Sequence, residues 1–175
     1  RRGGYGNLIT HEEDYRWPYL RKMMSPLTFF LFNFSFIASY QNILLWLLTF
    51  PVYIVMQSKR HNLHLIDIIL AVFFVLFLCM ETIADQQHWV FQEYKKNLTL
   101  AQRKKHERKD IRDGFLQSGL FVYSRHPNYF AEQAIWVTVY AFTISNSEQG
   151  LFFLNYACIG SILLILLFQG SMAFS

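Results

Sequence analysis

The stretch Gly119-Leu-Phe-Val-Tyr-Ser-Arg-His-Pro-Asn-Tyr-Phe-Ala-Glu132 decides the fold, because a turn rich in polar and charged groups leads here directly into an apolar run. Pro127 has a restricted φ and no N–H, so we predict that it is the first residue of a helix. The unpaired N–H groups at that helix start, with Arg125 and His126 beside them, suit a phosphate or a carboxylate. The sequence therefore predicts an anion-binding helix start at the end of this turn.

The helix that begins at Pro127 is expected to carry polar groups on one face. Asn128, Glu132 and Trp136 recur every four residues, so their side chains lie on the same side of a helix. A glutamate and an asparagine that face inward near a bilayer are expensive unless they hold a ligand or a partner. We therefore treat this face as a candidate binding site.

A second polar stripe is predicted on an earlier helix. The apolar run that starts at Leu65 continues, without a helix breaker, into Glu81, Asp85, His88 and Gln92, at spacings of four, three and four residues. A solvated helix face explains His88 and Gln92 well. It explains Glu81 and Asp85 less well, because they directly follow the apolar run. For these two acids a functional role and a solvated face remain equal alternatives.

The composition is that of a membrane protein. Hydrophobic residues make up 53% of the 175 residues and aromatic residues 18%, which is more apolar surface than a soluble domain of this length can bury. We predict an all-α, polytopic membrane helix bundle over residues 25–175, with about four transmembrane helices, in what we expect to be a segment of a longer protein. The predicted spans are residues 26–56 (tilted or broken near Pro51), 65–96 (with an extension beyond the membrane), 128–145 and 151–168.

Charge sets the predicted topology. A polar arm, residues 1–24, is expected to lie at the membrane surface, and residues 97–118 form a basic, solvated loop on the same side. Of the sixteen Lys and Arg residues, only Lys59 and Arg60 fall on the other side, so the positive-inside rule places the basic side in the cytosol or in the mitochondrial matrix. We expect the endoplasmic reticulum membrane, with the mitochondrial inner membrane as the alternative.

Two classes of function fit the sequence poorly. The basic residues flank apolar spans and form no recognised nucleic-acid-binding module, so we expect no nucleic-acid partner. Cys79 and Cys158 are the only cysteines, and both lie in apolar runs. We predict neither a disulfide framework nor a metal site, and we interpret both cysteines as small packing residues.

The element Tyr-Ser-Arg-His-Pro-Asn-Tyr-Phe, residues 123–130, followed by Glu132 and Trp136, resembles the signature of the membrane steroid 5-alpha-reductase superfamily. It is most similar to the broad, mostly uncharacterised branch that shares the C-terminal domain of the reductases. Isoprenylcysteine carboxyl methyltransferases and sterol C14 reductases are more distant relatives with a similar Arg-His-Pro-x-Tyr element. The resemblance runs in matching order along the whole chain.

The resemblance implies an NADPH site in a crevice among the spans, open to the cytosol. The positions that match the family's cofactor site or its signature element are Asp85, Arg125, His126, Asn128, Glu132 and Trp136. A guanidinium suits a bidentate grip on phosphate, and Arg16 is a weaker candidate for a second phosphate contact. The implied reaction is reduction of a conjugated C=C bond in an apolar, sterol-like or polyprenoid lipid.

The chain departs from the family pattern in three respects. Ala131 stands where relatives have Gly, which we expect to add a methyl group close to the cofactor. Gln92 occupies a position that is usually basic, so that Lys95 or Lys96 would have to replace the missing charge. The substrate-polarising pair and the last cofactor segment of the steroid enzymes match regions outside this sequence, so no catalytic residue is assigned.

Three functions therefore remain open at the level of sequence. The first is an NADPH-dependent lipid reductase of the bilayer. The second is a membrane methyltransferase that uses S-adenosylmethionine, because relatives with that activity share the Arg-His-Pro-x-Tyr element. The third is a catalytically idle subunit that packs against partner subunits in a larger membrane complex, which the departures at Ala131 and Gln92 favour.

Overall fold

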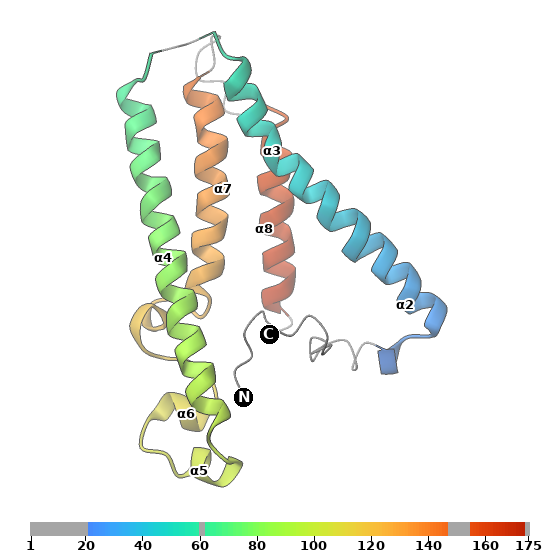
Figure 1. The fold of residues 1–175 in the computed structure, drawn as a ribbon, viewed down its shortest axis with the longest axis vertical. Helices are drawn as coiled ribbons and strands as arrows, with labels where there is room; N and C mark the ends of the chain where they lie inside the picture. Colours follow the sequence, from blue (N-terminus) through green and yellow to red (C-terminus); the bar gives the residue numbers. More distant parts are fainter. Residues whose placement is uncertain (1–20, 60–61, 147–154, 174–175) are drawn as a thin grey trace, which may run out of the picture. The chain divides into compact units, whose positions relative to one another are not determined.

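The computed structural model describes residues 21–59, 62–146 and 155–173, and every regular element in these ranges is a helix (Figure 1). The all-α prediction is therefore confirmed for this part of the chain. The elements are α2 (Pro26–Phe32), the π-helix η1 (Asn33–Tyr40), α3 (Gln41–Gln57), α4 (Leu65–Lys96), α5 (Leu100–Lys104), α6 (Lys109–Asp113), the 3₁₀-helix η2 (Gly119–Val122), α7 (Pro127–Ser145) and α8 (Cys158–Ala173).

The chain divides into two compact units, residues 1–43 and 44–175. In the first unit, the Ser25 side chain accepts a hydrogen bond from the Thr28 N–H at 3.2 Å and so caps α2. The helix then widens into η1, where the Ser39 hydroxyl donates to the Phe34 carbonyl five residues earlier, at 2.7 Å. That spacing is the one a π-helix provides. The helical run from α2 to α3 corresponds to the first predicted span.

In the second unit, α3 and α8 cross closely at a small residue. Pro51 lies inside α3 and has no N–H, so the carbonyl of Leu47 lacks its usual helical partner. Gly160 of α8 lies at this point, since a Cβ atom there would be 2.8 Å from the Leu47 carbonyl oxygen. The proline thus coincides with a close helix–helix approach, of the kind that small residues permit.

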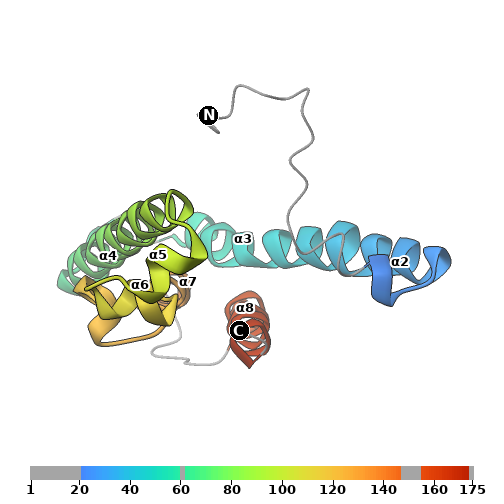
Figure 2. The ribbon, with the colours of Figure 1, turned by 90° about the horizontal axis from the view of Figure 1, so that it is seen from below.

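The second unit is built around α4 and α7, which run antiparallel and side by side (Figures 1 and 2). Asn128 of α7 donates to Asp85 of α4 at 3.0 Å, and Ser145 of α7 donates to Asp67 of α4 at 2.6 Å. At 1.5 Å per residue, the two ties lie about 26 Å apart along the helices. This separation is close to the hydrocarbon thickness of a bilayer, about 30 Å.

Two helical segments within the described ranges are long and apolar enough to cross a membrane, Pro26–Gln57 and Leu65–Lys96. A shorter apolar segment, Cys158–Ser171, lies in α8. Apolar side chains along α4 are widely exposed, for example Val72 and Leu76. These findings support a helical membrane protein, while the total of four spans stays a prediction. The predicted arm at residues 1–24 lies largely outside the described residues, as does the start of the predicted span 151–168.

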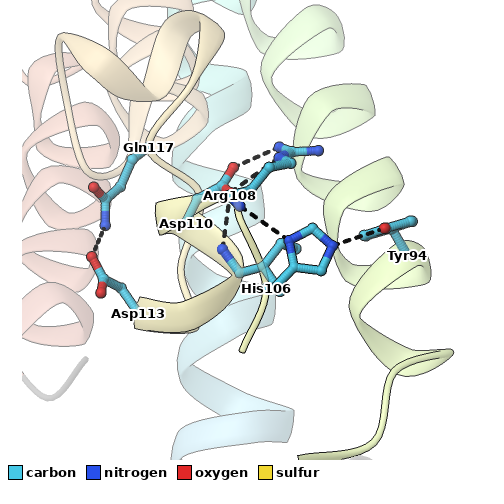
Figure 3. Close-up of polar contacts among 7 residues, drawn as sticks. Tyr94, His106, Arg108, Asp110, Asp113 and Gln117 are labelled. Atoms are coloured by element: carbon cyan, nitrogen blue, oxygen red, sulfur yellow. Dashed lines mark hydrogen bonds and ion pairs between the residues drawn. The ribbon is translucent and has the colours of Figure 1, made fainter. Parts of the chain in front are cut away.

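The basic segment 97–118, which we expected to be a plain solvated loop, forms a small folded knob at the end of α4. Ile111 and Leu116 pack against Phe91 of α4 in one buried apolar cluster. Figure 3 shows polar contacts of this segment: His106 bonds to the Tyr94 hydroxyl at 3.0 Å and accepts from the Arg108 N–H, while Arg108 pairs with Asp110 and Gln117 donates to Asp113. The sequence did not reveal this cluster, because its apolar residues are isolated among charges.

Candidate functional site

The turn before α7 is fixed to α4 through one glycine. Gly119 has φ +63°, a backbone conformation that favours glycine, and a Cβ there would meet the Gln87 side chain, with Cδ at 2.7 Å. The Gln87 side-chain oxygen accepts a hydrogen bond from the Leu120 N–H at 3.0 Å. This contact anchors η2 on α4. It thereby positions the turn that follows η2 and the start of α7 at Pro127. Pro127 is the first residue of α7, as predicted.

Polar side chains of α4 face polar side chains at the start of α7, and we call this set the polar ladder. In its middle, the Asn128 amide donates to the Asp85 carboxylate at 3.0 Å. A step of four residues along α4, from Asp85 to Glu81, is matched by a step of four along α7 in the opposite direction, from Asn128 to Glu132, as antiparallel helices require. Beyond Asp85 and Asn128, the ladder continues to His88 of α4 and to His126, the residue before α7.

The innermost step of the ladder contains two carboxyl groups. Glu81 lies four residues from Asp85 on α4 and Glu132 four residues from Asn128 on α7, so the antiparallel register brings the two acids opposite each other. The indole N–H of Trp136 donates to the same Glu132, with 3.2 Å between Nε1 and Oε1. The innermost step thus gathers two acids and an indole N–H close to the end of the apolar section of α4.

The outermost part of the ladder holds His126 next to the cation of Arg125, while the His88 ring stacks on Phe121 of η2. Burial lowers the pKa of the His126 imidazole from its ordinary value, and the neighbouring Arg125 and His88 lower it further. The ring of His126 stacks on Tyr129 with 5.0 Å between centroids, and Tyr129 in turn contacts Phe168 of α8. The neutral form of His126 is thus favoured, and its ring is linked to α8 through the Tyr129 ring.

Arg125 is exposed in the turn that precedes α7. Its guanidinium carbon lies 6.0 Å from the centroid of the Phe115 ring, a distance typical of a cation–π contact. Arg125 does not bond to the acids of the polar ladder in the described part of the chain. It therefore supplies a positive charge at the open end of the site.

A groove of about 380 Å³ runs along α4 beside the ladder. Its walls combine carboxyl groups with apolar and aromatic surface. The lining residues are Leu78, Glu81, Thr82, Asp85, Gln86 and Trp89. Carboxylates can accept hydrogen bonds from ribose hydroxyls or an amide, and an exposed indole offers a flat surface for stacking. The groove therefore suits a polar ligand that carries a planar ring.

Two of the departures from the family pattern, at Ala131 and Gln92, lie in the described part of the chain. Ala131 is fully buried on the packed face of α7, so its methyl group does not project into the groove. Gln92 bonds to the His88 ring at 3.1 Å and extends the polar stripe of α4. Lys95 donates to the Gly114 carbonyl at 2.6 Å, so its charge is engaged in holding the knob. Lys96 lies 3.9 Å from Glu93 on the exposed side of α4.

The structure brings together four of the six predicted site residues, Asp85, Asn128, Glu132 and Trp136. His126 lies at the outer end of the ladder, and Arg125 in the turn beyond it. Arg16 lies outside the described residues.

Sequence analysis left the role of Glu81 open between function and a solvated face, and it did not consider Gln87. Glu81 comes opposite Glu132 through the register that Asp85 and Asn128 set between the two helices. No pattern in the sequence pointed to Gln87, because its role depends on the close approach of Gly119.

Comparison with known proteins places the chain in a family. A family model described as "Protein of unknown function (DUF1295)" matches residues 5–174. An uncharacterised protein of Schizosaccharomyces pombe is 36% identical over 176 residues, which cover 98% of this chain and 49% of that protein. The chain thus spans about half the length of the curated relative it matches. No solved structure matches the chain. DUF1295 lies in the steroid 5-alpha-reductase-like group, which confirms the resemblance at that level but not the branch or the distant relatives. The chain belongs to the DUF1295 family.

Proposed function

We propose that the protein is an integral-membrane reductase that uses NADPH to reduce a C=C bond in a sterol-like or polyprenoid lipid. The polar ladder and its groove line the cofactor site in this proposal. The basic side of the chain faces the cytosol, where NADPH is available, and the membrane is that of the endoplasmic reticulum. Family membership and the chemistry of the ladder support the proposal.

The single observation that carries the proposal is the bond from Asn128 to Asp85. It joins the two elements that the resemblance identifies as cofactor-lining, and it uses only one of the two oxygens of an exposed carboxylate. A polar pair needed only for helix packing is usually buried with its hydrogen-bonding capacity filled. An exposed pair beside a groove is instead available to a ligand.

The residues present fit the groups of a dinucleotide. Arg125, with the free N–H groups of the α7 start nearby, suits phosphate oxygens. Asp85 and Glu132 provide acceptors for ribose hydroxyls or for the amide of a nicotinamide. The groove volume of about 380 Å³ lies within the range of small-molecule sites.

When bound, NADPH supplies a hydride and is oxidised to NADP⁺. The residues of this chain bind and orient it. The exposed guanidinium of Arg125 holds a phosphate, and the polar ladder holds the ribose or nicotinamide end. The apolar wall of the groove, which includes Leu78 and Trp89, excludes water from that end. The lipid substrate enters from the bilayer that surrounds the apolar section of α4.

The direct test is to purify the complete protein and supply NADPH with a lipid enone. We expect oxidation of NADPH that depends on the lipid, and we expect Arg125→Ala to abolish it at a nucleotide concentration near the wild-type Kd. Denaturing the purified protein should release a nicotinamide nucleotide. Release of S-adenosylmethionine would contradict the reductase and establish the methyltransferase. A protein that releases no nucleotide, oxidises no NADPH and copurifies stoichiometrically with partner subunits would be the idle subunit.

A further inference from the structure

A second hollow, separate from the groove beside the polar ladder, lies between α3, α4 and α7. Its volume is about 390 Å³ and all its lining side chains in the described part of the chain are apolar, so we call it the apolar hollow. We propose that it binds the hydrocarbon chain of the lipid substrate, which is then a polyprenoid enone. The inference rests on the proposed reductase function for the identity of the substrate.

Hydrogen bonds hold the three helices together at one end of the apolar hollow. Ser58, just after α3, donates to the Asn146 carbonyl just after α7 at 3.3 Å, and Ser145 of α7 donates to Asp67 of α4 at 2.6 Å. All of these residues and the lining of the hollow belong to the second compact unit. The hollow is therefore enclosed by helices of one unit that are bonded to one another.

The lining residues form two rings that are stacked along the helices. The first ring lies one helical turn from the hydrogen-bonded end and contains Val55 of α3, Ala71 of α4 and Phe142 of α7. The second ring lies one further turn along and contains Val52, Val75 and Val139. The hollow thus extends parallel to the helices, which is the direction in which lipid chains lie in a bilayer.

The apolar hollow is aligned with the groove on α4. Steps of four, three and four residues lead from Ala71 through Val75 and Leu78 to Thr82, so all four share one helix face. The first two line the hollow and the last two line the groove. Val75 and Leu78 are only about 4.5 Å apart along the helix axis. A lipid in the hollow therefore has its near end at the inner end of the cofactor groove.

The chemistry of the walls selects a hydrocarbon chain as the occupant. A polar headgroup in the hollow would lose its hydrogen bonds to water and find no polar side chain among the described lining residues. Both α3 and α4 belong to segments that are long and apolar enough to cross a membrane, so hydrocarbon surrounds the hollow. From Leu78 to Ala71 the distance along α4 is about 10 Å, and the substrate chain extends at least that far from the reacting carbon.

The fit of the chain, rather than its apolar character, makes the hollow selective. Lipid tails are as apolar as the side chains of the hollow, so a chain that leaves the bilayer gains only closer packing. A larger side chain inside the hollow should therefore exclude a long substrate chain and have no effect on a substrate too short to reach it.

Steady-state kinetics test this selectivity with the complete protein in phosphatidylcholine vesicles, NADPH and two enones that carry one or three isoprene units. Ala71→Leu and Val52→Phe fill the hollow from different walls. We expect each to lower kcat/KM for the longer enone by about 10-fold or more, with the value for the shorter enone unchanged. Ala101→Leu, on the exposed α5, is the matched control and should alter neither value. Equal losses for the two enones, or no loss, would overturn the proposal.

Photolabelling tests the hollow without any catalytic turnover. The complete protein, without nucleotide, is irradiated in the same vesicles with an enone whose three-isoprene chain carries a diazirine. We expect labels on residues 52–56 and 139–142, and fewer labels in Ala71→Leu. Even labelling of exposed side chains such as Val72 and Leu76 would indicate ordinary contact with the bilayer, and an unlabelled hollow would indicate that another protein segment fills it. Either result contradicts the proposal. If the hollow is labelled and the wild type oxidises no NADPH with either enone, the reductase function fails while the chain site stands.

Discussion

The two ends of the α4–α7 pair are tied by the same chemistry, yet they differ in exposure. At one end, Asp67 is only 5% exposed and accepts hydrogen bonds from the His64 N–H and the Ser145 hydroxyl. At the other end, Asp85 is exposed and accepts from Asn128 beside a groove. A shielded aspartate with both oxygens bonded holds helices together, whereas an exposed one at a groove can also meet a ligand. Asp67 and Asp85 are the same residue type, so it is their difference in burial that distinguishes a structural contact from the candidate site.

The number of polar groups also differs between the two ends. The Asp67 end needs one acid to cap α4 and to bond to α7. The other end stacks three polar steps, which include the acids Glu81 and Glu132 and the histidines His88 and His126. Joining two helices does not require so many ionisable groups. The additional ionisable groups at this end therefore indicate a binding function.

The largest expected effect on stability comes from the buried tie. Asp67→Ala removes a helix cap and a charge-assisted bond, and we expect it to lower the free energy of unfolding by about 3 kcal/mol. For a domain of this size, that loss corresponds to a fall in Tm of about 6 to 12 °C. Asp85→Ala, the matched change at the exposed end, should leave Tm nearly unchanged and weaken NADPH binding. Thermal unfolding in detergent measures the first quantity, and equal Tm losses in the two variants would remove the distinction between tie and site.

The next effect concerns the charge at the open end of the site. Charge-assisted hydrogen bonds contribute about 1.5–3 kcal/mol, so Arg125→Ala should raise the Kd for NADPH by about 10- to 150-fold. Lys104→Ala removes a positive charge from the exposed α5 and is the matched control, with Kd unchanged. A nicotinamide fluorescence titration measures both constants. An Arg125→Ala protein that binds NADPH as tightly as the wild type would exclude Arg125 from the site.

A smaller effect isolates the contact that anchors η2. Gly119 and Gly114 both have positive φ, +63° and +85°, but only Gly119 approaches a side chain closely, that of Gln87. Each change to alanine should cost about 1–2 kcal/mol for the backbone conformation. Gly119→Ala should destabilise the protein further, and it should also weaken NADPH binding, because η2 leads into the Arg125 turn. Chemical unfolding of both variants measures the difference, and equal losses would show that the Gln87 contact does not position the site.

The smallest effect is a pH dependence at the outer step of the ladder. Because the pKa of His126 is lowered in the folded protein, the unfolded chain binds more protons at acidic pH. The stability contribution is therefore full above the unfolded pKa of about 6.5 and declines as the pH falls through and below it. Wild-type Tm should drop more than that of His126→Gln between about pH 7.5 and pH 5.5. A parallel decline in both proteins would show that His126 is not held in its neutral form.

Much of the helical frame followed from the sequence. Pro127 marked the start of α7 because its restricted φ suits a first helical position, and the unbroken run after Leu65 gave a single helix ending at Lys96. The spacing of Glu132 and Trp136 put both on one helix face, where they are bonded.

The sequence did not determine the register between helices or which side chains are buried. The pairing of α4 with α7 depends on contacts between residues more than forty positions apart, such as Asp85 with Asn128, and periodicity within one helix does not encode them. Asp67 was overlooked because an acid in an apolar run has no distinctive pattern until its partner Ser145 is known. The burial of Ala131, read from sequence as a methyl group near the cofactor, likewise required the packing of α7.

The most direct test of the central claim is a structure of the complete protein determined with NADPH. We predict density for a dinucleotide in contact with Asp85, Asn128 and Glu132, with a phosphate at Arg125, while Asp67 and Ser145 remain bonded to each other at the far end. Density from neighbouring protein or lipid that fills the groove, with no dinucleotide beside the ladder at saturating NADPH, would contradict the account.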